Sequence, residues 1–219
     1  ITKEETWRLA EKWFGKIPAR DISQPLIPQE PMQTEQRRLT VERDVPADVL
    51  YMSFPIASLT HEDFHCCDMI SDILAAGRSC RLNRHLVEER HLFTSIDAYI
   101  QPRIDPGQLL ICGMPAEGVS MEAAEAAVWE ELEHLAAEGI NAEELEKVKN
   151  KFETNFMRER ANRQKLAAQL AFYEMLGDEA WADQEVEKYR SVTEERFMQV
   201  YKETVLPEKA SILWYMKKG

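Results

Sequence analysis

The stretch DMISDILAAGRSCRLNRHLVEERHLFTSIDAY, residues 68–99, decides the fold. It starts within the apolar segment FHCCDMISDILAAG, which predicts a helix closed by Gly77. A short helix is predicted at 80–90 and a strand near 92–100. LLICGM at 109–114 is the predicted neighbouring strand, because the turn-forming DPGQ separates the two. This region therefore predicts helices followed by a β-hairpin.

Upstream of this region, the sequence predicts a helix, a connector and two strands. Residues 3–14 have an apolar helical face, and the proline-rich IPARDISQPLIPQEP after them predicts an extended connector. RRLTVER (37–43) alternates and VLYMSFPI (49–56) is rich in β-forming residues, so both are predicted strands. Thr60 is the predicted N-cap of the helix that follows, with Asp63 three residues further on.

The second half of the chain is predicted to be helical. Ser120 caps a helix that ends at Gly139, and Asn141 caps a longer apolar pattern that reaches Tyr173. The middle of that pattern, MRERANRQK, is strongly polar, so we expect the helix to kink there or to cross a domain surface. Thr193 begins another helix, and ASILWYM is the predicted last strand. Hairpin-joined strands with grouped helices predict an α+β fold with a largely antiparallel sheet.

Composition excludes several classes of protein. The net charge of -12 repels phosphate backbones, so nucleic-acid binding is not expected. The sequence contains no apolar run long enough to span a membrane, and we expect a soluble protein of the cytoplasm or periplasm. The four cysteines lack C-x-x-C spacing and are expected to be buried free thiols. A start at Ile1 instead of methionine suggests a piece of a longer polypeptide.

The segment HEDFH at 61–65 fits the pattern H-E-x-x-H, in which two histidines bind zinc and the glutamate activates a water. Its context favours a solvated helix end, because His61 follows the predicted cap and Asp63 is placed to cap the first turn. A stand-alone zinc peptidase that uses His61, Glu62 and His65 stays an alternative. The carboxylates of GDEAWADQE are expected to be a similar solvated cap.

The order and spacing of these elements resemble the pitrilysin/insulinase family of zinc metallopeptidases. AEKWFGKIP (10–18) is similar to the family's link between successive domains, and EGINAEELEKVKNKF (138–152) is similar to the opening of its long helix. The matching residues of the stretch 68–99 are Ile73, Leu74, Gly77, Ser79, Arg81, Leu82, Leu86, Glu88 and Leu92. The resemblance extends over nearly the whole chain.

The family builds a clamp from two similar halves, and the resemblance implies which half this chain is. In the family, the first half binds zinc through H-x-x-E-H, and the second half lacks metal and closes the chamber around an unfolded peptide. This chain has no H-x-x-E-H. The resemblance therefore implies an N-terminal helix and linker from a preceding domain (1–35) and a non-zinc-binding clamp domain (36–219). No cofactor is expected here; zinc is expected in a homologous partner domain, in the same polypeptide or in another chain.

Active members of the family place an arginine and, seven residues later, a tyrosine in the metal-free half to hold the substrate. By the resemblance, these positions are Val87 and Thr94, which supply neither a cation nor a phenol. Arg81, Arg84 and Arg90 are the candidates for contact with a peptide substrate. We expect the chain alone to be inactive. A catalytically inactive structural or interaction subunit with the same fold is the alternative.

Overall fold

The computed structural model describes residues 1–21, 28 and 30–218, which divide into the compact units Ile1–Met32 and Gln33–Gly219. The first unit contains α1 (Lys3–Phe14), as predicted, and none of its helical residues is buried. The Thr2 side chain caps α1 by accepting a hydrogen bond from the Glu5 N–H. Residues 22–27 and 29 of the predicted connector lie outside the described residues. The assignment of 1–35 to a link from a preceding domain stays a prediction.

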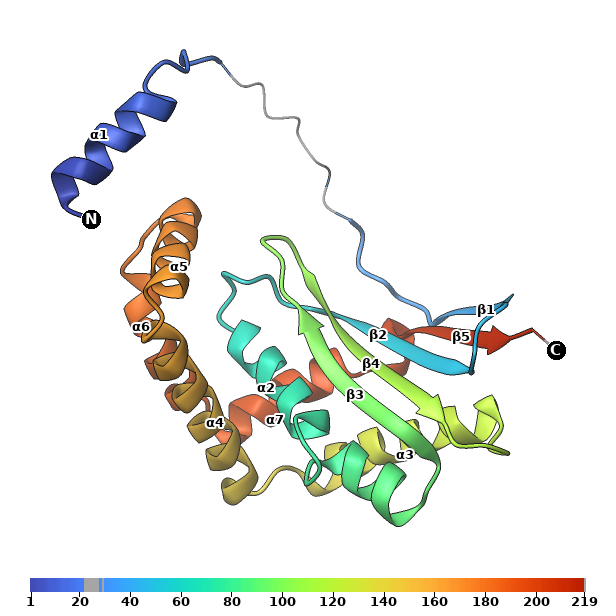
Figure 1. Ribbon diagram of the computed structural model, residues 1–219. Helices are drawn as coiled ribbons and strands as arrows, with labels where there is room; N and C mark the ends of the chain where they lie inside the picture. The colour runs from blue at the N-terminus through green and yellow to red at the C-terminus, as the bar shows by residue number, and fades with distance from the viewer. Residues whose placement is uncertain (22–27, 29, 219) are drawn as a thin grey trace. The chain divides into compact units, whose positions relative to one another are not determined.

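The second unit is built on a five-stranded sheet in the order β1-β5-β2-β4-β3 (Figure 1). Its strands are β1 (Arg37–Arg43), β2 (Val49–Ile56), β3 (Phe93–Gln101), β4 (Gly107–Pro115) and β5 (Ser211–Lys217). The pairs β2–β4, β2–β5 and β3–β4 are antiparallel, so the predicted α+β fold with a largely antiparallel sheet is confirmed. The sequence did not indicate the exception, because β1 pairs in parallel with β5 from the other end of the unit.

One face of the sheet is covered by helices. These are α2 (Phe64–Ala75), α3 (Met121–Glu138) and α7 (Glu194–Thr204), which lie on the same side of the strands (Figure 1). Successive strand residues point to opposite faces, and the alternate β2 residues Leu50, Met52, Phe54 and Ile56 are all buried beneath these helices. The hydrophobic core therefore lies between the sheet and one helical layer.

A buried carboxylate attaches the edge of the sheet to this helical layer. Glu125 of α3 accepts hydrogen bonds from the Arg38 guanidinium of β1 and from the indole N–H groups of Trp129 and Trp214. Its side chain is only 5% exposed, whereas Arg38 is 49% exposed. Glu125 thus links both β1 and β5 to α3, because it accepts hydrogen bonds from a side chain of each strand.

The start of α2 corrects a prediction. The helix begins at Phe64, with Asp63 as its N-cap, and not after Thr60. Residues before it form turns, in which the His61 N–H donates to Ser58 and the Phe64 N–H donates to His61. The Asp63 side chain makes no capping hydrogen bond, because its carboxylate pairs with Arg196. The motif HEDFH therefore straddles the helix boundary.

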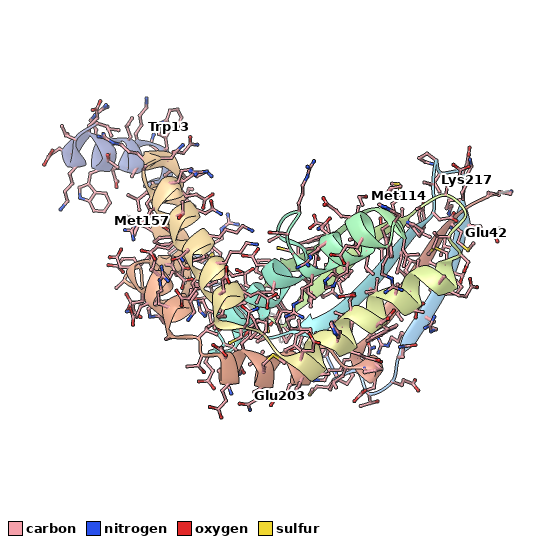
Figure 2. The ribbon with its side chains drawn as sticks, turned by 90° about the horizontal axis from the view of Figure 1, so that it is seen from below. Trp13, Glu42, Met114, Met157, Glu203 and Lys217 are labelled. Carbon is pink, nitrogen blue, oxygen red and sulfur yellow. The ribbon has the colours of Figure 1, made fainter. Side chains whose placement is uncertain are left out.

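Three further helices form a group beside the sheet layer (Figures 1 and 2). They are α4 (Ala142–Arg160), α5 (Arg163–Leu176) and α6 (Trp181–Ser191). Asn141 starts α4 in a capping box with Glu144, as its sequence predicts. The polar stretch after α4 is a complete break rather than a kink, because Asn162 caps α5 by accepting from two N–H groups. Within the described residues, no helix is both long and apolar enough to cross a membrane.

The connections η1 (Asn83–Glu89) and η2 (Pro207–Lys209) complete the unit. η1 is π-helical and occupies the predicted short helix between α2 and β3. The predicted hairpin of β3 and β4 is confirmed, with Gln101 opposite Gln108 at its turn.

Candidate functional site

At the two positions that the family uses for its Arg/Tyr pair, the side chains of this chain make contacts within the fold. Val87, in η1, is half-buried and packs against the core. Thr94, on the edge strand β3, donates its hydroxyl to the Met114 carbonyl oxygen at 3.1 Å. Neither side chain offers a cation or an acidic phenol to a reacting carbonyl.

The three candidate substrate-contact arginines all make ion pairs within the chain. Arg81 binds both carboxylate oxygens of Glu144, at 3.0 and 2.8 Å, and donates to the Gly139 carbonyl at 3.1 Å. Burial tends to raise the pKa of Glu144, but its hydrogen bonds with Arg81 and Asn141 lower it overall. Arg81 therefore fixes the start of α4. Its side chain is 13% exposed, so contact with a substrate would require it to leave this pair.

Arg84 and Arg90 are more accessible. Arg84 pairs with Glu89 at 2.9 Å, and Arg90 pairs with Glu130 of α3 at 2.8 Å. Their side chains are 64% and 40% exposed, and exposed pairs of this kind exchange readily with other charged partners. Contact of any of the three arginines with a substrate stays a prediction.

The side chains of the motif HEDFH have three different partners. His61 Nδ1 accepts a hydrogen bond from the Asp63 N–H at 3.1 Å, and Glu62 lies 3.4 Å from the Arg196 guanidinium. His65 Nε2 lies 3.2 Å from Glu185 of α6. In the described part of the chain, no group of three or more His, Cys, Asp or Glu side chains is arranged to hold a metal ion. The residues of this motif do not fit a zinc centre.

His65 belongs to a buried polar network that joins α2 to α6. Glu185, 11% exposed in its side chain, also accepts from Lys188 at 3.1 Å. Burial would raise the pKa of Glu185, but hydrogen bonds from His65 and Lys188 hold it below its ordinary value. One turn along, Tyr189 donates to Asp68, and burial raises the pKa values of both groups.

Sequence reasoning missed Glu185. It assigned the carboxylates of GDEAWADQE to a solvated cap, whereas Glu185 is buried in the described structure. No local signal could have found it, because its partner His65 is 120 residues away.

The network borders a cavity of about 690 Å³ between the start of α2 and helices α5, α6 and α7. All three residues singled out in HEDFH line it: His61, Glu62 and His65. Its apolar lining is Leu59, Phe64, Tyr173, Leu176, Trp181 and Val192. A cavity of this size, with aromatic walls and a few polar groups, is typical of a ligand-binding site.

The cysteines offer no reactive nucleophile. All four are free thiols. Burial raises the pKa of the Cys66 thiol to about 12, and burial also raises the pKa of Cys80, whose Sγ contacts the Asp72 carbonyl at 3.3 Å. The thiolate form is therefore disfavoured at neutral pH.

Comparison with known proteins identifies the family. The family model described as "Peptidase M16 inactive domain" matches residues 1–152, and the chain belongs to this family. It is an inactive, C-terminal-type domain of M16 zinc-protease-like proteins, which confirms the resemblance to the pitrilysin/insulinase peptidases. A comparison with curated proteins finds no match.

Solved structures support the fold. A protease from Helicobacter pylori is 19% identical with a TM-score of 0.90, over 99% of this chain and 53% of that one. A peptidase M16 inactive domain from Pseudomonas fluorescens is 15% identical with a TM-score of 0.82, over 100% of this chain and 52% of that one. The periplasmic protease PqqL from Escherichia coli is 16% identical with a TM-score of 0.73, over 100% of this chain and 24% of that one. The chain thus spans about half the length of the first two.

Proposed function

We propose that this chain is the metal-free half of an M16-type peptidase clamp. It would pair with a homologous zinc-bearing domain, in the same polypeptide or in another chain, and form the wall that closes over an unfolded peptide. The observation that carries this proposal is the apolar face of the sheet opposite the helices.

That face is defined by the strand register. Leu39, Leu213, Tyr51 and Cys112 lie side by side across β1, β5, β2 and β4, on the side opposite Leu50 and Met52. The next rows add Val41, Tyr215 and Val49, and Leu110 with Tyr99. We call these residues, together with Met114 beside them, the outer sheet face.

The outer sheet face is open to solvent in the described second unit. Leu39, Tyr99 and Met114 are 60%, 41% and 38% exposed, and the middle strands contribute half-buried side chains (Met114 is labelled in Figure 2). Asp97, Ser53 and Ser211 lie on the same face, but its rows are otherwise apolar, and an exposed apolar surface is characteristic of a protein–protein interface. This supports pairing with a second domain.

A second candidate function follows from the Arg/Tyr positions. Val87 packs against the core and Thr94 bonds to Met114, so this half supplies neither of the family's substrate-holding groups from those positions. These observations favour a catalytically inactive interaction subunit that keeps the fold and the outer sheet face. Both candidates assemble with a partner domain, and they differ in whether the assembly hydrolyses peptides.

Complementation distinguishes the two. The chain is mixed with a separately produced M16 domain that carries H-x-x-E-H, and hydrolysis of a quenched fluorescent unfolded peptide is followed. We expect no hydrolysis by either component alone, and chelator-sensitive hydrolysis by the mixture. A stable complex without hydrolysis identifies the interaction subunit. Chelator-sensitive hydrolysis by the chain alone overturns both proposals and favours the zinc peptidase built on His61, Glu62 and His65.

A further inference from the structure

The cavity beside HEDFH has a charge balance that selects its ligand. Its lining contains two cations, Lys188 and Arg196, and each is already paired within the chain. Lys188 is bound by the buried Glu185, and Arg196 by Asp63, whose side chain is 16% exposed. Neither cation is left free to attract an anion.

Glu62 is the carboxylate that remains. Its side chain is 82% exposed, and it lies 3.4 Å from the Arg196 guanidinium. Arg196 also pairs with Asp63, so the two carboxylates share one guanidinium. The charges that face the cavity, with Asp63 behind Arg196 included, are three carboxylates against two cations. Glu62 is the most exposed of these charged side chains, at 82% against 37% for Lys188 and for Arg196, so the open side of the cavity presents a carboxylate to an incoming ligand.

The apolar walls suit a long aliphatic chain that ends in a cation. Trp181, Leu176 and Phe64 all line the cavity, and the Lys188 ammonium lies 5.9 Å from the Trp181 ring centroid. The chain itself therefore already places one amine over this indole. Lysine and arginine bury their aliphatic stems on apolar surface while the charged head stays near water, and a cation over an indole is stabilised further.

We propose that this cavity binds a lysine or arginine side chain of an extended polypeptide segment, with the stem against Trp181 and the charged head beside Glu62. The net charge of -12 attracts such a segment at long range. Binding does not depend on the proposed clamp function, since it requires neither zinc nor a partner domain.

The test is a fluorescence anisotropy titration of the full chain with a labelled peptide of glycine and serine that contains two lysines. The comparison peptide has glutamates in place of the lysines, and neither has an apolar residue that would bind the outer sheet face. We expect saturable binding of the lysine peptide only, weakened by high salt. Equal binding of both peptides, or no saturable binding of the lysine peptide, overturns the proposal.

Variants locate the binding. Glu62→Gln is expected to weaken it about two- to fivefold, as for an exposed ion pair, and Glu62→Lys to abolish it. The matched control is Glu187→Gln, an exposed carboxylate on α6 that does not line the cavity. Trp181→Ala should weaken binding about fivefold, with Trp181→Phe intermediate and a thermal melt to check folding. Equal effects of the Glu62→Gln and Glu187→Gln variants would indicate general attraction to an acidic surface and overturn the assignment.

Because this assay measures binding by the chain alone, its failure leaves the complementation result intact. A failed complementation likewise leaves the binding result intact.

Discussion

His91 shows how one residue sets the path between η1 and β3. Among the described residues other than glycine, it alone has a positive φ, 52°. Its ring Nδ1 lies 3.0 Å from the Val87 carbonyl, which partly compensates for the left-handed backbone. Side chains with a Cβ adopt this region at a cost, and β-branched ones at a larger cost.

Substitutions at His91 test this account. We expect His91→Gly to change the free energy of unfolding little or to raise it by up to about 1 kcal/mol, because glycine adopts this φ freely. His91→Val should lower it by about 1–2 kcal/mol. Urea denaturation measures both. A valine variant as stable as the wild type would show that the backbone relaxes to another conformation.

Glu125 is the residue on which the edge of the sheet depends. Removing its carboxylate leaves the indole N–H groups of Trp129 and Trp214 without their acceptor, while Arg38 can turn to solvent. We expect Glu125→Ala to lower the free energy of unfolding by about 2–3 kcal/mol. The exposed Glu122→Ala on the same helix is the control and should change it by less than about 0.5 kcal/mol. Equal effects would show that the hydrogen bonds of Glu125 with Arg38, Trp129 and Trp214 contribute nothing measurable.

At the scale of elements, α6 is held to α2 by the pair His65–Glu185. The lowered pKa of Glu185 means that its charged form is favoured by folding. The contribution of Glu185 to the free energy of unfolding is therefore complete above the pKa of about 4.3 that a glutamate has in the unfolded chain. It disappears as the pH falls through the lower pKa of the folded state. The raised pKa of Asp68 acts in the opposite direction.

We expect Glu185→Gln to destabilise the chain by about 1–3 kcal/mol at neutral pH. The difference from wild type should shrink as the pH falls below about 4. Guanidinium unfolding across this range measures it, with the exposed Glu187→Gln as control. A difference that is constant with pH would rule out the charged pair as the source of the stability.

The break between α4 and α5 depends on a cap. Asn162 accepts from the N–H groups of Gln164 and Lys165 at 3.0 and 3.2 Å. Asn162→Ala should cost about 1 kcal/mol, whereas Asn155→Ala within α4 should be neutral or slightly stabilising, because alanine is the better helix former. Thermal unfolding followed by circular dichroism compares them. Equal melting temperatures would mean that α5 starts without this cap.

At the scale of the whole molecule, the proposed function assigns the outer sheet face to assembly and not to the stability of the isolated chain. We expect Leu39→Lys with Met114→Lys to change the free energy of unfolding by less than about 0.5 kcal/mol per site, since both side chains are exposed. The same pair should weaken binding to the zinc-bearing domain more than about tenfold, because it places two charges within an apolar interface.

Met157→Lys on α4 is the matched control, since Met157 is 61% exposed and lies outside the sheet. Isothermal titration calorimetry of each variant with the zinc-bearing domain compares them. Undiminished binding of the double variant would show that the two halves meet through another surface.

The sequence by itself determined most of the elements of this protein and indicated its family, because local signals carry them. It predicted one continuous helical pattern where the structure has α4 and α5, and it did not predict α6. The alternating strand β1, the β-former-rich strand β2, and the caps Asn141 and Thr193 all lie where their residues predict them. The prediction of a cap at Thr60 was wrong, because residues 58–63 form hydrogen-bonded turns and the helix begins only at Phe64.

Only the tertiary structure decided which polar groups meet. Glu185 finds His65 across 120 residues, and Arg38 finds Glu125 across 87. Such pairs follow from the packing of helices on the sheet, which leaves no periodic trace in the sequence. For the same reason, the segment HEDFH, which matches zinc peptidases in sequence, lines a cavity. The fold places Glu185 and Trp181 of α6 in the same lining, and no group of side chains among the described residues is arranged to hold a metal ion.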